Sequence, residues 1–159
     1  IRRPPRSTQS RSSAASDVYK RQDKIQLDKH LARHRLADLF IDTFNVNAHT
    51  TASDALWAGL PVVTKLGKSF AARVAGSLLT AVDLPELIVG TSEDYEALIL
   101  DLANNPKRLT EIKKKLMKNR LSMPLFDTEL FAKHLEDGYR QAYNRYLTGH
   151  GTVNIDVSK

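Results

Sequence analysis

The sequence predicts an α/β domain in which a Rossmann-like parallel sheet is flanked by helices. Short apolar runs at residues 39–41, 61–64 and 87–89 read as buried strands, and longer segments with helical periodicity separate them. This alternation is typical of βαβ units, in which crossover helices make neighbouring strands parallel. A chain of 159 residues with 42% hydrophobic residues is also long enough to form one buried core.

Cap and stop residues mark the helices of the first half of the chain. Asp28 should cap a helix that runs to about Leu36. Thr51 and Asp54 have the three-residue spacing of a capping box, so Thr51 should be the N-cap of a second helix. That helix should end at Gly59, because glycine readily adopts the left-handed conformation that follows a helix.

Helical periodicity continues through the second half. Seven apolar residues recur at the spacing of one buried helix face, namely Phe70, Ala71, Val74, Ala75, Leu78, Leu79 and Val82. Ser92 and Pro106 should begin two further helices, and a long last helix should run from about Thr128 to Tyr146. This last helix carries an aromatic stripe that is either core or a surface for another domain. The stripe consists of Tyr139, Tyr143 and Tyr146.

The positive charge of the chain is concentrated in its first 22 residues. The formal net charge is +6 at pH 7. Residues 1–22 hold six of the 24 Lys and Arg residues and one of the 18 Asp and Glu residues, so the remainder has 18 basic and 17 acidic residues. This balance argues against a nucleic-acid-binding domain. Lys113, Lys114 and Lys115 alternate with apolar residues and are expected on a solvated helix face.

Residues 1–22 are rich in Ser, Arg and Pro and have no apolar period, so they are expected to be disordered. The alternatives are an RNA-binding arm and a transit peptide. The string IRRPPRSTQSRSSAASDVYKRQ resembles a translated sequencing-library adapter, and we therefore expect Asp23 to lie in the middle of a longer protein.

Several kinds of site are not expected. The longest apolar run is far shorter than the roughly 20 residues of a membrane span. The chain has no cysteine, which fits a cytoplasmic location. Val62 stands where a P-loop ending in Gly67 and Lys68 would need glycine. The histidines show no metal-ligand spacing, so no metal site is expected.

Two groups of polar residues are candidates for ligand binding. Parallel sheets bind ligands at the carboxyl ends of their strands, where helix amino termini converge. His49, Thr50 and Thr51 follow the first strand and open a helix, so their hydroxyl and N–H groups suit a diphosphate. An ordinary helix cap without a ligand has the same spacing. His30 and Arg33 share one helix face and could contact a nucleotide base, or they form a solvated basic face.

The segment from His30 to Leu79 resembles glycosyltransferase family 41, which contains O-linked N-acetylglucosamine transferases and SPINDLY-type fucosyltransferases. The resemblance rests on HTTASDALWAGLPVVT, on GKSFAARVA and, nearer the carboxyl terminus, on RLSMPLFDTELFAKHLEDGYRQAYNRY. It implies a GT-B enzyme with two Rossmann-like halves, of which this chain is the carboxyl-terminal, donor-binding one. The implied reaction is inverting transfer of a sugar from UDP, expected to be N-acetylglucosamine, to a protein Ser or Thr without a metal or cofactor.

The resemblance also implies a role for each polar candidate. His30 and Arg33 would contact the base, and Asp54 the ribose. The residues implied at the phosphates are His49, Thr50 and Thr51. Leu27 stands where some relatives have a lysine near the ribose. No catalytic residue is expected in this chain, because the acceptor contacts, the general base and a further lysine on the diphosphate would belong to the absent half.

The expected organisation has three parts. Residues 1–22 would be foreign and unstructured, residues 23–147 would form the nucleotide-sugar-binding domain, and residues 148–159 would be a polar tail. The expected partners are the donor, an acceptor protein, the amino-terminal half and tetratricopeptide repeats, but neither nucleic acid nor a membrane. Two other functions stay open, namely a GDP-fucose protein O-fucosyltransferase of SPINDLY type and a non-catalytic nucleotide-binding or interaction module.

Overall fold

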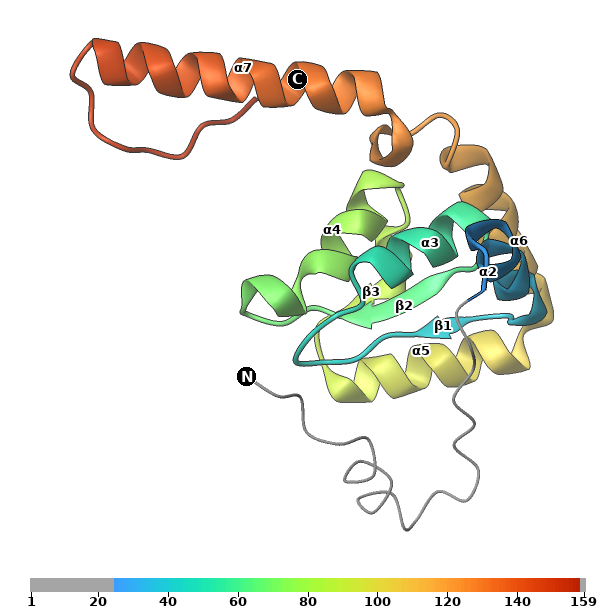
Figure 1. Cartoon of the computed structure of the whole chain (residues 1–159). Helices are drawn as coiled ribbons and strands as arrows, with labels where there is room; N and C mark the ends of the chain where they lie inside the picture. Colours follow the sequence, from blue (N-terminus) through green and yellow to red (C-terminus); the bar gives the residue numbers. More distant parts are fainter. Residues whose placement is uncertain (1–24, 158–159) are drawn as a thin grey trace, which may run out of the picture.

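The computed structural model describes residues 25–157, so the expectations for residues 1–22 lie outside the described part (Figure 1). Three parallel strands form a sheet in the order β1 (Phe40–Ile41), β2 (Val62–Lys65) and β3 (Ile88–Val89). In their registers, Phe40 is the partner of Val62 and Thr64 is the partner of Ile88. A parallel sheet with flanking helices confirms the predicted fold class.

Helices cover both faces of this sheet. On one face lie α3 (Thr50–Ala58) and α4 (Val74–Ala81), and on the other lies α5 (Ser92–Asn104), as Figure 1 shows. Beside α5 packs α6 (Pro106–Asn119). The connecting and flanking elements are α2 (Leu27–Arg33), η1 (His34–Leu36), η2 (Phe70–Ala72), η3 (Pro85–Leu87), η4 (Pro124–Phe126) and α7 (Thr128–Leu147).

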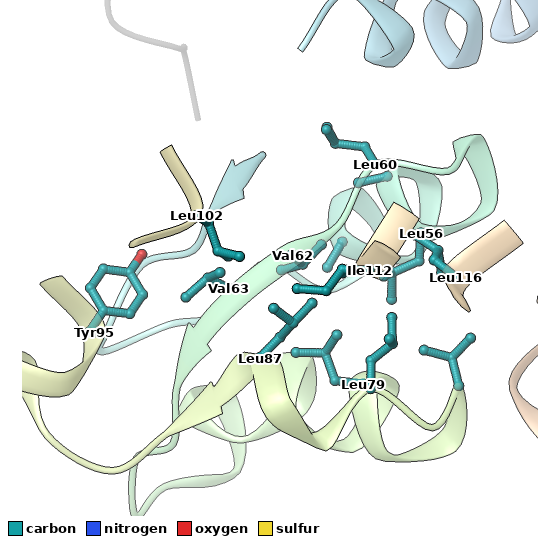
Figure 2. Packing of buried hydrophobic residues seen from close by; sticks show 14 residues of the cluster. Leu56, Leu60, Val62, Val63, Leu79, Leu87, Tyr95, Leu102, Ile112 and Leu116 are labelled. Atoms are coloured by element: carbon teal, nitrogen blue, oxygen red, sulfur yellow. The ribbon is translucent and has the colours of Figure 1, made fainter. Parts of the chain in front are cut away.

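The core is centred on β2, whose residues Val62, Val63 and Thr64 are fully buried. Both faces of this strand are covered, which explains why it reads as an unbroken apolar run in the sequence. Figure 2 shows the packed side chains around β2, with Tyr95 at one end of the cluster. The four helices α3 to α6 contribute inward residues, including Leu56, Leu79, Leu102, Ile112 and Leu116. Full burial of one such side chain contributes about 1.5–3 kcal/mol.

The predicted capping box at the start of α3 is wrong. The helix begins two residues earlier than predicted, at Thr50, and its N-cap is His49, which makes no side-chain capping bond. Thr51 is therefore a residue of the first turn and not the cap. The predicted end is confirmed, because Gly59 follows the helix with φ of +90°.

Of two other predicted helix starts, one differs from the structure and one is confirmed. The N-cap of α2 is Gln26, and Asp28 lies in the first turn, where its charge still favours the helix dipole. The helix α5 begins at Ser92 as predicted, but its cap is Thr91, which accepts a hydrogen bond from the N–H of Asp94 at 3.0 Å. Such patterns locate a helix start only to within a few residues.

The segment from residue 70 to 82 forms η2 and α4 rather than one helix. Phe70, predicted on the buried face, is 83% exposed. Ala75, Leu79 and Val82 are buried as predicted. Ser69 caps η2 by accepting a hydrogen bond from the N–H of Ala72 at 3.3 Å.

The long helix α7 projects from the body of the domain (Figure 1). None of its residues is buried. It is connected through η4, where Phe126 packs edge to face on Trp57 with ring centroids 5.1 Å apart. The aromatic stripe is therefore not core in this structure, since Tyr139, Tyr143 and Tyr146 are 69%, 62% and 78% exposed.

Candidate functional site

The candidate site lies at the carboxyl-terminal edge of the sheet, where the loops after β1 and β2 approach the start of α3 (Figure 1). Asp42 follows β1 directly and is only 4% exposed. Its Oδ1 accepts the backbone N–H of Ala48 at 2.7 Å, and its Oδ2 accepts the hydroxyl of Thr64 at 2.6 Å. These two bonds tie the loop to β2 and so fix the place where α3 begins.

Tyr95 of α5 supports the same loop from the other side. Its hydroxyl donates to the backbone carbonyl of Asp42 at 2.5 Å, and its ring packs edge to face on Phe44 with centroids 4.9 Å apart. Burial raises the pKa of Tyr95 to about 12, and the Asp42 carboxylate adds to the shift. Lys65 of β2 lies over the Phe44 ring at 4.3 Å and donates to Ser92 at 3.0 Å.

The three predicted phosphate-binding residues lie together at the start of α3. His49, Thr50 and Thr51 are all exposed. The first N–H groups of a helix have no carbonyl partner within the helix, and they lie at the positive end of its dipole. Exposed hydroxyls beside such N–H groups make the start of α3 suitable for an anion.

His30 and Asp54, predicted at the base and the ribose, are also brought together. The distance from Nε2 of His30 on α2 to Oδ2 of Asp54 on α3 is 3.7 Å. Both side chains are about a quarter exposed, at 26% and 27%, so the pair remains accessible. With a rise of 1.5 Å per residue, Asp54 lies about 6 Å along α3 from Thr50. Polar groups therefore extend from α2 to the first turn of α3.

Arg33 is placed differently from the other five predicted residues. It lines a cavity of about 490 Å³ at the outer side of β1, and the other lining residues are His34, Leu36, Ala37, Leu39, Phe40, Ile41 and Leu60. The spacing of His30 and Arg33 suggested one shared face, but His30 is directed at Asp54. Leu27 is exposed at the start of α2.

Sequence reasoning missed Asp42, Tyr95 and Asn47. Asn47 is buried, its Nδ2 donates to the carbonyl of Thr43 at 2.8 Å, and its backbone N–H donates to the carbonyl of Ala71 at 2.8 Å. Asp42 could have been found, because it is a carboxylate directly after a buried strand on the edge where ligands bind. The role of Tyr95 has no such signal, since its partner is 53 residues away.

Two kinds of feature are not found among residues 25–157. No group of three or more His, Cys, Asp or Glu side chains is arranged to hold a metal ion in this part of the chain. No helix of the described part is long and apolar enough to cross a membrane.

The sequence profile described as glycosyl transferase family 41 matches residues 21–135. An Arabidopsis thaliana relative named "Probable UDP-N-acetylglucosamine--peptide N-acetylglucosaminyltransferase SEC" is 41% identical over 85% of this chain, which covers 14% of the relative. A Caenorhabditis elegans UDP-N-acetylglucosamine--peptide N-acetylglucosaminyltransferase is 37% identical over 82% of this chain and 12% of its own length. A Hordeum vulgare relative named SPINDLY is 38% identical over 76% of this chain.

A solved structure gives the same family. A mutant of the Thermobaculum terrenum O-GlcNAc transferase superimposes with a TM-score of 0.71 at 32% identity, over 76% of this chain and 23% of that chain. The chain thus spans about an eighth of the length of the relatives and about a quarter of the solved enzyme. The profile, the relatives and the structure agree, and the chain belongs to glycosyltransferase family 41.

Proposed function

We propose that this chain is the donor-binding half of a protein O-glycosyltransferase and that it binds a UDP-sugar, expected to be UDP-N-acetylglucosamine. One observation carries the proposal: the His30–Asp54 pair, at 3.7 Å, lies along α3 from the exposed Thr50 and Thr51 at its start. These groups can contact the nucleoside and the diphosphate of one ligand. The relatives that match most of the chain are named as UDP-N-acetylglucosamine–peptide transferases, which supports this donor.

In the proposed complex each predicted residue keeps one role. The His30 ring stacks on the base. For Arg33 to hydrogen-bond the base carbonyl, its side chain must move from the cavity beside β1 towards His30. Asp54 accepts the ribose hydroxyls. The diphosphate binds to Thr50 and Thr51 at the start of α3, with His49 beside it. Donors at a helix start stabilise negative charge that develops as the glycosidic bond breaks, so UDP becomes a better leaving group without a metal ion.

The acceptor and the general base are proposed to belong to another part of the complete enzyme. The chain covers only 14% of the Arabidopsis relative, so there is ample room for a second half and for repeats in such a protein. The exposed stripe on α7 supports a contact with that half, because exposed apolar patches mark interaction surfaces. The reaction would transfer the sugar to a Ser or Thr hydroxyl with inversion.

The diphosphate contact is tested with Thr50→Ala. UDP and uridine are titrated calorimetrically, and the variant should lose more affinity for UDP, since only UDP carries phosphates. Thr110→Ala is the matched control, because Thr110 is an exposed helical threonine on α6. Equal losses for UDP and uridine would place Thr50 away from the phosphates.

The proposal that the acceptor site and the general base lie outside this chain is tested with the purified chain. It should bind UDP weakly, because without the other half of the enzyme the ligand stays exposed to water, which screens the charged contacts. It should transfer no radiolabelled sugar from UDP-N-acetylglucosamine to a peptide. Turnover by the purified chain would contradict the proposal that the general base lies elsewhere, and a preference for GDP over UDP would assign the chain to the fucosyltransferase type.

A further inference from the structure

Phe70 is unusual among the aromatic side chains near the candidate site. It is 83% exposed, although the surrounding periodicity would bury it. Its ring lies perpendicular to that of His49, with centroids 6.3 Å apart. Phe70 does not belong to the core cluster, so the core does not account for a phenylalanine at this position.

The backbone that carries Phe70 is firmly held. The carbonyl of Ala71 accepts the N–H of Asn47 at 2.8 Å, and the carbonyl of Ala72 accepts the N–H of Gly67 at 2.8 Å. A Cβ on Gly67 would lie 2.4 Å from the Cβ of Ala72, so the loop after β2 packs directly on η2. Because this backbone is held, a ligand that binds the ring needs to order only the side-chain torsions of Phe70.

The position of Phe70 relative to the proposed donor follows from the order of the other contacts. The nucleoside end lies at His30 and Asp54, and the diphosphate lies at the start of α3. His49 precedes Thr50, so the ring beside His49 lies past the diphosphate, on the side away from α2. In a nucleotide sugar the group beyond the diphosphate is the sugar.

We propose that Phe70 stacks on the apolar face of the donor sugar ring and helps to select the sugar. This inference rests on the proposed function. One face of a pyranose presents C–H groups, and an aromatic ring is a suitable hydrophobic surface for them. Phe70 has no group that could transfer a proton, so it is a specificity-determining residue and not a catalytic one.

The test compares the affinities for UDP and for UDP-N-acetylglucosamine. Phe70→Ala should weaken the binding of UDP-N-acetylglucosamine about three- to tenfold, in the range expected for one aromatic contact. It should change the affinity for UDP less than about twofold, because the lost contact is to the sugar. Phe70→Tyr should restore most of the sugar affinity. In saturation-transfer NMR, the sugar protons should receive less magnetisation from the Phe70→Ala variant than from the wild type.

Phe131→Ala is the matched control, because Phe131 is similarly exposed but lies on α7, and it should leave both affinities unchanged. An equal loss of affinity for UDP and for UDP-N-acetylglucosamine in Phe70→Ala would overturn the sugar contact. An unchanged affinity for both would overturn it as well. These results differ from failure of the proposed function, in which the wild type would bind neither ligand.

Discussion

Asp42 is expected to be the residue on which the geometry of the candidate site depends most. Its carboxylate accepts two hydrogen bonds, one from the N–H of Ala48 in the loop and one from the hydroxyl of Thr64 in β2. Asp42→Ala removes both acceptors at once. The loop that leads to the first turn of α3 then loses its side-chain bond to Thr64 of the sheet.

The expected change in the free energy of unfolding follows from the two donors that lose their acceptor. The Thr64 hydroxyl is fully buried, and a buried polar group without a partner costs about 1–3 kcal/mol. The N–H of Ala48 is half-buried and can regain part of its bonding from water. Removal of a buried carboxylate also removes its desolvation penalty, which partly offsets the loss of stability. We therefore expect Asp42→Ala to lower the free energy of unfolding by about 2–3 kcal/mol.

Urea denaturation followed by circular dichroism measures this change, and a double-mutant cycle assigns it to the bond. Thr64→Val removes the hydroxyl and keeps the shape of the side chain. If the bond carries the effect, Asp42→Ala should cost about 1–2 kcal/mol less in the Thr64→Val background than alone. The affinity for UDP should fall in parallel, since the start of α3 is no longer held.

Asp38→Ala is the control for loss of a carboxylate. Asp38 pairs with Lys113 at 2.7 Å but is exposed, and exposed ion pairs contribute little to stability. The urea midpoint of Asp38→Ala should match that of the wild type. The reasoning about Asp42 would be refuted if Asp42→Ala unfolded at the same urea concentration as Asp38→Ala, or if its effect were unchanged in the Thr64→Val background.

Three further results are expected. Because the pKa of Tyr95 is about 12 in the folded protein against 10.0 for an ordinary tyrosine, its stabilising effect is complete below pH 10 and is lost as the pH rises towards 12. The stability difference between the wild type and Tyr95→Phe should therefore shrink by about 2–3 kcal/mol between pH 9 and 12 in urea titrations, and a constant difference would contradict the shift. Thr51→Ala should change stability by less than about 0.5 kcal/mol, since Thr51 is not the cap, and a loss near 1 kcal/mol would restore the capping role. The exposed stripe on α7 should make the purified chain self-associate, and the double variant Tyr139→Ser/Tyr143→Ser should sediment as a smaller species; an identical sedimentation profile would show that the stripe is not the contact.

The fold could be predicted because its signals are local. A strand such as β2 is buried on both faces, so its residues form one apolar run. Helices such as α5 and α6 bury one face each, so their apolar residues recur at helical spacing. The sequence signals for the site are less local. Its frame depends on bonds between residues far apart in the chain, such as Asp42 to Thr64 and Tyr95 to Asp42. No spacing rule could have given the grouping of His30 with Asp54, because the two residues lie on different helices.

Phe70 shows why periodicity fails at the boundary between two kinds of helix. A 3₁₀ helix has three residues per turn and an α-helix has 3.6, so a buried face that is continuous in α4 cannot be extended back through η2. Arg73 separates the two elements with φ of −126° and ψ of −9°, which lie outside the α-helical region and change the direction of the chain. The spacing of Phe70 from Val74 therefore does not place the two side chains on one face. The same break that makes the sequence pattern misleading directs the ring of Phe70 outward, beside His49 and towards the proposed donor.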